Sequence, residues 1–166
     1  MTIHFGADST TLASGDVGGG GKVIGFQYDT DNTHRTFSGS WADCGMSIAY
    51  TPQSSSSKIE LRANLNMFAS CVQSTGSTTW GNGYIRILCD GSVIGEQWKY
   101  VVGLGHSGYY SHYATWKSWQ FNYSVVYSNS STSQKTFKPQ MFENSGVLEL
   151  NKEDGQSYFS LYEYEN

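Results

Sequence analysis

The stretch TPQSSSSKIELRANLNMF, residues 51–68, decides the fold class. After four serines, every second residue from Ile59 to Met67 is apolar, and the residues between them are polar. A period of two places the two sets on opposite faces of a β-strand, whereas a helix would spread the apolar residues around its axis. One buried apolar face and one solvent-exposed polar face are typical of an antiparallel sheet. We therefore predict a strand here, entered through a loop made of Pro52 and the serines.

Shorter patterns of the same kind recur along the chain at intervals of roughly ten residues, which is typical of a two-sheet sandwich. Asp90-Gly91 lies between two apolar runs and favours the type I′ turn of a hairpin. Pro139 cannot donate to a ladder, so its segment is expected to be an edge strand. The last two segments, on either side of KEDGQ, are expected to form a closing hairpin. The expected strands are residues 23–29, 35–41, 46–51, 58–69, 119–127, 135–143, 146–151 and 157–165, together with the two strands of the hairpin at 84–96.

The fold class that follows is all-β, an antiparallel two-sheet jelly-roll sandwich with a short flexible N-terminal arm. Residues 7–22 are small, polar and glycine-rich, and we assign residues 1–22 to an arm or linker. Residues 23–166 form the jelly-roll domain. Ile3 and Phe5 are apolar residues within this arm, which makes them the candidate anchor of the N-terminus to another surface.

Composition excludes several classes of protein. Charged residues are 14% of the 166 residues, against an average of about 25%, and the net charge of -4 argues against nucleic acid as a partner. The N-terminus lacks the pattern of a signal peptide, and no apolar run is long enough to cross a membrane. Cys44, Cys71 and Cys89 have no metal-type spacing, so we expect them to be buried small apolar residues in a chain made in a reducing cytosol.

No segment predicts catalysis, a cofactor or a metal site. Residues 103–108 spell GxGxxG, but no amphipathic helix or downstream acidic residue follows, as nucleotide binding would need. His106 and His112 lack the further ligands that zinc requires. The carboxylates Glu60, Asp90 and Glu163 are expected on solvated faces of strands or in a turn. We therefore expect that the protein is not an enzyme.

An aromatic segment is the most informative candidate surface. Its rings are separated by Gly, Ser and His, a composition that suits a recognition surface or a subunit interface. Packing or a subunit contact is the interpretation we favour, and recognition of a ligand such as a sugar is the alternative. The candidate residues are Trp98, Tyr100, Tyr109, Tyr110, Tyr113 and Trp116.

The order of several segments resembles a known family. These segments are IHFGADST at the start, KVIGFQYD, YTPQSSSSKIEL, GYIRILCDGSVIG and the closing SYFSLYEYE. Together they resemble small virion-surface domains of tailed bacteriophages, which occur as capsid decorations, fibres or C-terminal tips of tail fibres. In that family a serine-rich loop leads into a core strand that begins SSSKI. The resemblance covers most of residues 23–166, and the chain departs from it in the longer aromatic segment at 97–117.

The resemblance implies trimeric jelly rolls of the tumour-necrosis-factor and C1q type, with no catalytic residues. The expected function is thus a non-enzymatic virion structural protein, a homotrimer on the capsid or tail surface, made in the host cytoplasm. The arm would attach it to the major capsid protein or another tail protein. The alternative is a lectin-like tail-fibre tip for host attachment, which recognises host glycans. Neither nucleic acid nor a membrane is expected as a partner, and no cofactor.

Overall fold

The computed structural model describes residues 4–5, 10–11, 21–74, 77–78, 82–97 and 114–166, and in these ranges all regular structure is β-strand. The strands are β1 (His4–Phe5), β2 (Thr10–Thr11), β3 (Val23–Asp31), β4 (Arg35–Phe37), β5 (Ala42–Asp43), β6 (Ile48–Tyr50), β7 (Lys58–Ser74), β8 (Ser77–Thr78), β9 (Asn82–Cys89), β10 (Ser92–Gln97), β11 (Ala114–Ser128), β12 (Lys135–Ser145), β13 (Val147–Leu150) and β14 (Ser157–Tyr164).

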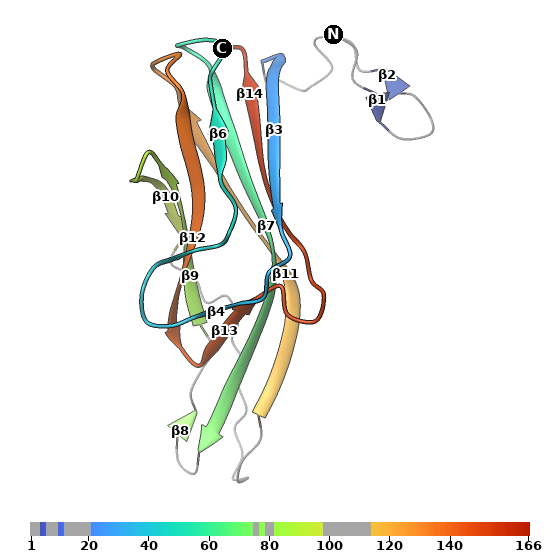
Figure 1. Ribbon diagram of the computed structural model, residues 1–166, viewed down its shortest axis with the longest axis vertical. Helices are drawn as coiled ribbons and strands as arrows, with labels where there is room; N and C mark the ends of the chain where they lie inside the picture. The colour runs from blue at the N-terminus through green and yellow to red at the C-terminus, as the bar shows by residue number, and fades with distance from the viewer. Residues whose placement is uncertain (1–3, 6–9, 12–20, 75–76, 79–81, 98–113) are drawn as a thin grey trace.

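Eight of these strands form two antiparallel sheets in jelly-roll order (Figure 1). The larger sheet contains the series β3-β14-β7-β11, and the smaller sheet contains β6-β12-β9-β10. Along the chain these are the first, eighth, third and sixth strands, facing the second, seventh, fourth and fifth. That order is two interleaved Greek keys, so the predicted jelly-roll sandwich is confirmed. The short β4 and β13 extend the larger sheet, β5 extends the smaller, and β1 pairs with β2.

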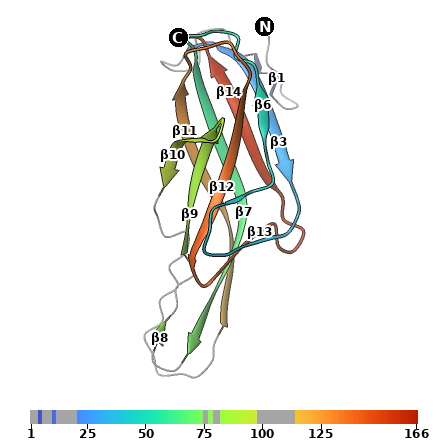
Figure 2. The same cartoon turned by 60° about the vertical axis from the view of Figure 1, so that its left-hand side comes forward.

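Strand β7 is the central strand of the larger sheet and confirms the prediction made for residues 58–69. It pairs with β11 without a break from Lys58 opposite Ser128 to Val72 opposite Ala114. Its five alternating apolar side chains, from Ile59 to Met67, are buried in the core, while Glu60 and Arg62 point to the other face. Figures 1 and 2 show β7 and β11 running together past the ends of the other long strands, with the short β8 beside the far end of β7.

The core lies between the sheets and is built from their inward-facing side chains. The largest fully buried ones include Phe137, Phe159, Met46, Ile85 and Met141. Cys44 and Cys89 are also buried, as predicted, and burial raises the pKa of both thiols. The side chain of Cys71 lies outside the described residues. Burying these apolar groups supplies the main driving force for folding.

The β9–β10 hairpin has the predicted two-residue turn. Cys89 pairs directly with Ser92, so Asp90 and Gly91 alone connect the strands. Both have positive φ, 48° and 82°, as a type I′ turn requires. The carboxylate of Asp90 also accepts the backbone N–H of Thr136 at 2.8 Å, which ties the turn to β12.

Strand β12 is not an edge strand, which corrects the expectation based on Pro139. It lies between β9 on one side and β5 and β6 on the other. On that second side, β6 pairs with residues 135–137 and β5 with residues 140–141, so Pro139 sits in the gap between them. Its carbonyl points into this gap and accepts the N–H of Cys44 at 3.1 Å. A missing N–H on the same side therefore costs no ladder hydrogen bond.

The predicted closing hairpin of residues 146–151 and 157–165 is also wrong. Strands β13 and β14 do not pair with each other, because both are antiparallel to β7 and thus run in the same direction. Since β11 occupies the other edge of β7, they follow one another along a single edge, as one strand interrupted by a loop. Asn151 begins this loop with a φ of 55° and donates its N–H to Asn66 at 2.9 Å.

Glu163 is fully buried, which corrects the expectation that it is solvated. On β14 it shares the inward face with Phe159 and Leu161, at the end where the serine loop crosses the core. The Tyr50 hydroxyl donates to its Oε2 at 2.7 Å and the Ser57 hydroxyl to its Oε1 at 2.6 Å. The backbone N–H groups of Gln53 and Ser54 also donate to it, at 2.9 Å and 3.2 Å. The serine loop therefore wraps this one carboxylate.

These donors decide the charge of the buried group. Burial by itself raises the pKa of Glu163, but the hydrogen bonds from Gln53, Ser57, Tyr50 and Ser54 outweigh it and hold the pKa below its ordinary value. Burial of the Tyr50 hydroxyl is the larger cause that raises the pKa of Tyr50. The hydrogen bond between Tyr50 and Glu163 raises the pKa of Tyr50 further, while it lowers that of Glu163. Glu163 is thus ionised at neutral pH inside the protein.

We predict that Glu163→Gln lowers the free energy of unfolding by about 1–3 kcal/mol, because charge-assisted hydrogen bonds become neutral ones. Urea denaturation with an unchanged slope would measure this loss. Glu165→Gln, at an exposed position two residues later, is the matched control and should change stability by less than about 0.5 kcal/mol. Equal stability of the two variants would contradict the anchoring role of Glu163.

We also predict that this contribution depends on pH. Because the folded pKa of Glu163 lies below the unfolded one, its stabilisation is fully present above the ordinary pKa of about 4.3 and is lost as pH falls through the folded pKa. The difference in unfolding free energy between the wild type and Glu163→Gln should be constant from about pH 6 to 7 and shrink below about pH 4. A difference that grows on acidification would contradict the assignment.

Candidate interaction surface on the larger sheet

Most of the site residues predicted from the sequence lie outside the described residues. These are Ile3, Trp98, Tyr100, Tyr109, Tyr110 and Tyr113, together with the glycine-rich run 103–108, His106 and His112. For two others only the strand position is described: Trp116 is opposite Ser70, and Phe5 is opposite Thr10. The roles proposed for all of them stay predictions.

The outer face of the larger sheet is the surface that the structure describes best. The pairing of β3, β14, β7 and β11 places their outward-facing side chains in rows across the four strands. Three consecutive rows are Thr30–Tyr158–Asn64–Asn122, Tyr28–Ser160–Arg62–Ser124 and Phe26–Tyr162–Glu60–Val126. Because each row is fixed by backbone pairing, its side chains form one rigid array. We call these twelve residues the outer-face array.

Exposed rings gather on the β3 and β14 side of this array. Phe26, Tyr28 and Tyr158 are 52%, 62% and 45% exposed. The Phe26 ring lies 5.9 Å from that of Tyr28 and 4.9 Å from that of Tyr162. Of the described large apolar side chains that are strongly exposed, four of five belong to the array, with Val126 as the fourth. Clustering of exposed apolar side chains is typical of interaction sites.

A paired charge occupies the β7 side of the array. Arg62 donates through Nε and Nη2 to the two carboxylate oxygens of Glu60, both at 2.9 Å. Tyr164 donates its hydroxyl to the same carboxylate at 2.9 Å, and the Arg62 guanidinium lies 4.9 Å from the centre of the Tyr162 ring. The hydrogen bond from Arg62 lowers the pKa of Glu60, and Glu60 in turn raises the pKa of Arg62. Both groups are charged at neutral pH and neutralise each other.

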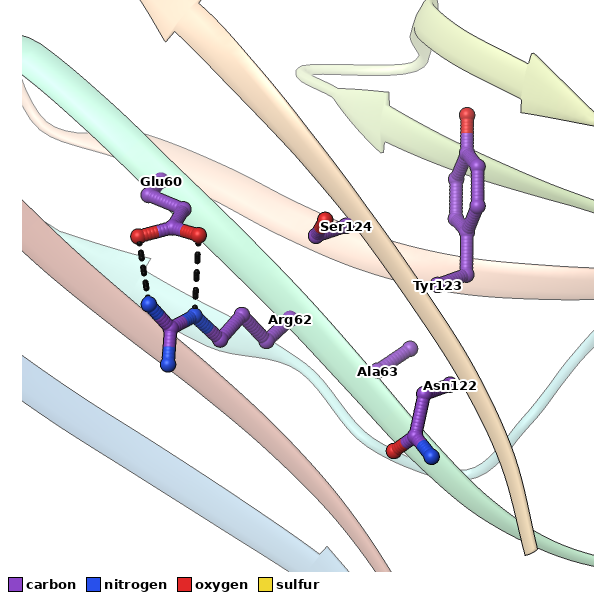
Figure 3. Close-up of a pocket in the computed structure, with 6 residues that line it drawn as sticks. All are labelled: Glu60, Arg62, Ala63, Asn122, Tyr123 and Ser124. Atoms are coloured by element: carbon purple, nitrogen blue, oxygen red, sulfur yellow. Dashed lines mark hydrogen bonds and ion pairs between the residues drawn. The ribbon is translucent and has the colours of Figure 1, made fainter.

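Beside this ion pair the surface is hollowed between β7 and β11. The hollow has a volume of about 280 Å³ and is lined by Glu60, Arg62, Ala63, Asn122, Tyr123 and Ser124. Figure 3 shows the ion pair on β7, with Asn122 and Ser124 on the neighbouring strand and the Tyr123 ring pointing away from the pair. The hollow therefore presents amide, hydroxyl and guanidinium groups.

The edge formed by β10 and β11 is a second feature of the molecule (Figure 2). Of the described strands, only β7 pairs with β11. The inward-facing side chains of β11, Phe121, Tyr123, Val125 and Tyr127, pack on the core but remain partly exposed. The backbone of β10 approaches them closely at Gly95, where a Cβ atom would lie 2.7 Å from Val125. Partly exposed apolar side chains therefore lie along an edge of β11 that no described strand pairs with.

The outer face of the smaller sheet carries a tighter cluster. The Arg86 guanidinium stacks 4.2 Å from the centre of the Trp41 ring and donates to Gln140 at 2.9 Å and 2.7 Å. Gln140 donates onward to Asp43 at 2.5 Å, and Phe142 packs against Trp41 at 5.7 Å. Because these groups are satisfied by one another, they stabilise the sheet.

Other titratable clusters in the described part of the chain are structural. Arg35 binds Asp31 through two hydrogen bonds, at 3.1 Å and 3.2 Å, and Glu149 lies between His34 at 3.0 Å and Lys152 at 2.8 Å. Within the described ranges, no three His, Cys, Asp or Glu residues gather where they could hold a metal ion. The same ranges contain no helix long and apolar enough to span a membrane.

The outer-face array was missed at the sequence level, although a signal for it exists. In SYFSLYEY the inward residues Phe159 and Leu161 alternate with Tyr158 and Tyr162. Rings on the outward set of a strand are unusual enough to suggest a recognition surface. Among known proteins, no family model and no curated protein matches the chain.

Proposed function

We propose that this protein is a non-enzymatic structural component of a tailed-bacteriophage virion, a homotrimeric decoration or fibre protein on the capsid or tail. Two things support the proposal. The jelly-roll sandwich is the fold that the sequence resemblance implies. The described surface also offers an open edge suited to assembly.

The β10–β11 edge is the observation that carries the proposal. An unpaired strand edge invites pairing with another chain, and a folded protein must cover or blunt it. Here the edge is accompanied by the partly exposed stripe of Phe121, Tyr123, Val125 and Tyr127. A second copy packed along this edge would bury both features, and a closed ring of copies would leave none of the edges open. That the ring contains three subunits is an expectation from the family resemblance.

The N-terminal arm would attach this ring to the major capsid protein or to another tail protein. The jelly-roll domain begins at Lys22, whose carbonyl accepts the N–H of Glu165, near the end of the chain, at 2.8 Å. Among the described strands, β1 and β2 pair only with each other and take no part in the two sheets. The two described strands of the arm thus lie outside the sandwich, which supports a role for the arm in contact with another protein.

We predict that the protein has the mass of a trimer in solution, three times 18.4 kDa, by light scattering at micromolar concentration. Val125→Lys should convert it to a folded monomer, because a lysine on an edge strand reaches solvent in the monomer but blocks a neighbouring copy. Val126→Lys is a matched control: it is the next residue of the same strand, 61% exposed on the outer face, and should leave the trimer intact. A monomeric wild type, or a trimeric Val125→Lys, would contradict the proposed edge contact.

We further predict that removing residues 1–21 leaves the jelly roll folded but abolishes attachment to the particle. Both sheets begin after this point, so the thermal midpoint should change little. The measurement is occupancy on virions assembled with the truncated protein, beside full-length protein as the control. Normal occupancy of the truncated protein would eliminate the arm as the anchor.

A further inference from the structure

The outer-face array combines two kinds of group that the assembly proposal does not use. Exposed rings of Phe26 and Tyr28 lie on β3, and a polar hollow lies between β7 and β11. The strands between them keep the two parts in register. From β3 to β11 there are three strand spacings of about 4.8 Å each, so the array spans about 14 Å. A ligand that contacts both parts must be longer than a single small ring.

The polar groups of the hollow are suited to hydroxyl groups. Two nitrogens of Arg62 are engaged by Glu60, while Nη1 has no hydrogen-bond partner within the described residues. The side chains of Asn122 and Ser124 likewise have none in that part of the chain, and both are exposed. Arg donates only, whereas an amide and a hydroxyl both donate and accept. A sugar hydroxyl, which also does both, can pair with each of them.

The charge of the array selects among sugars. Its three rows contain one carboxylate and one guanidinium, which are bound to each other. No net charge remains on the array, in a chain whose total is -4. An acidic sugar would meet the Glu60 carboxylate without an unpaired cation in the three rows to compensate it. In the next row Lys58 donates to the Ser128 hydroxyl at 2.8 Å, so the charge balance within the three rows themselves favours a neutral ligand there.

We propose that the outer-face array binds a neutral oligosaccharide. One sugar ring lies with its C–H face on the exposed rings of Phe26 and Tyr28, where the electron-rich faces of the rings attract the positively polarised C–H groups. The hydroxyls of a later sugar along the chain bind Arg62, Asn122 and Ser124 in the hollow. This site is separate from the aromatic segment at 98–116, and it does not depend on the trimer.

A second copy of the chain fits this array less well than a glycan does. A protein surface that covered the hollow would have to satisfy Arg62 Nη1, Asn122 and Ser124, since buried polar groups without partners are costly. The flat array also offers no row of purely apolar groups across all four strands. The β10–β11 edge, by contrast, carries the mainly apolar stripe of β11, and a neighbouring strand can satisfy the backbone groups of that edge.

The test uses the full-length protein on an array of neutral and acidic oligosaccharides, followed by calorimetric titration with a soluble glycan that binds. We expect binding to at least one neutral oligosaccharide. The double variant Phe26→Ala/Tyr28→Ala should weaken it by on the order of tenfold or more, and Asn122→Ala by a smaller factor. Val93→Ala is the matched control, because Val93 is a comparably exposed apolar residue, at 47%, on the other sheet. It should bind as the wild type does.

Three results would overturn the proposal: no neutral glycan bound, binding to acidic glycans alone, or an affinity that the double variant leaves unchanged. A fourth would be a change in light-scattering mass on Phe26→Ala/Tyr28→Ala, which would make the array a protein contact instead. The assembly proposal has its own test: it fails if the wild type has the mass of a monomer or if Val125→Lys has the mass of a trimer. A monomeric protein that binds a neutral glycan through the outer-face array would contradict the assembly proposal and support the glycan site.

Discussion

The buried carboxylate of Glu163 is the constraint on which one end of the molecule depends. It lies on β14 of the larger sheet and accepts the hydroxyl of Tyr50 from β6 of the smaller sheet, so a single group links the two layers. Its remaining lone pairs are filled by the serine loop that leads into β7. On the neighbouring β3, Gly25 has to lack a side chain, because a Cβ atom there would lie 1.7 Å from the Tyr50 oxygen. Four elements are thus organised around one charge.

This arrangement also determines where recognition can occur. Apart from the partly exposed stripe on β11, the inward faces of both sheets are used by the core and by the Glu163 cluster. The outward faces and the strand edges are what the sandwich can present. On the smaller sheet the outward groups of Trp41, Arg86 and Gln140 already satisfy one another. Within the described residues, the larger sheet keeps polar side chains without hydrogen-bond partners and exposed rings, and the β10–β11 edge keeps partly exposed apolar side chains; both properties favour a partner.

The alternation of apolar and polar residues predicted the sandwich well, because in most strands every second side chain is apolar and faces the core. It failed where a long-range contact outweighs that rule. Pro139 tolerates a central position because the neighbouring edge changes from β6 to β5 beside it, and no local pattern shows such a gap. Glu163 is buried because donors from a loop more than a hundred residues earlier converge on it. The array was missed for a similar reason, since Phe26 and Tyr162 become neighbours only through pairing of distant strands.

Strand β11 shows how the two proposed activities can share one element without competing. Its side chains alternate between the inner edge stripe and the outer face, so Val125 and Val126 belong to different surfaces although they are consecutive in sequence. The period of two that defines a strand separates the two surfaces completely. A change on one set leaves the other set in place, provided that pairing with β7 is kept. Assembly through the edge would therefore leave the outer-face array turned toward solvent, where a sugar chain can reach it.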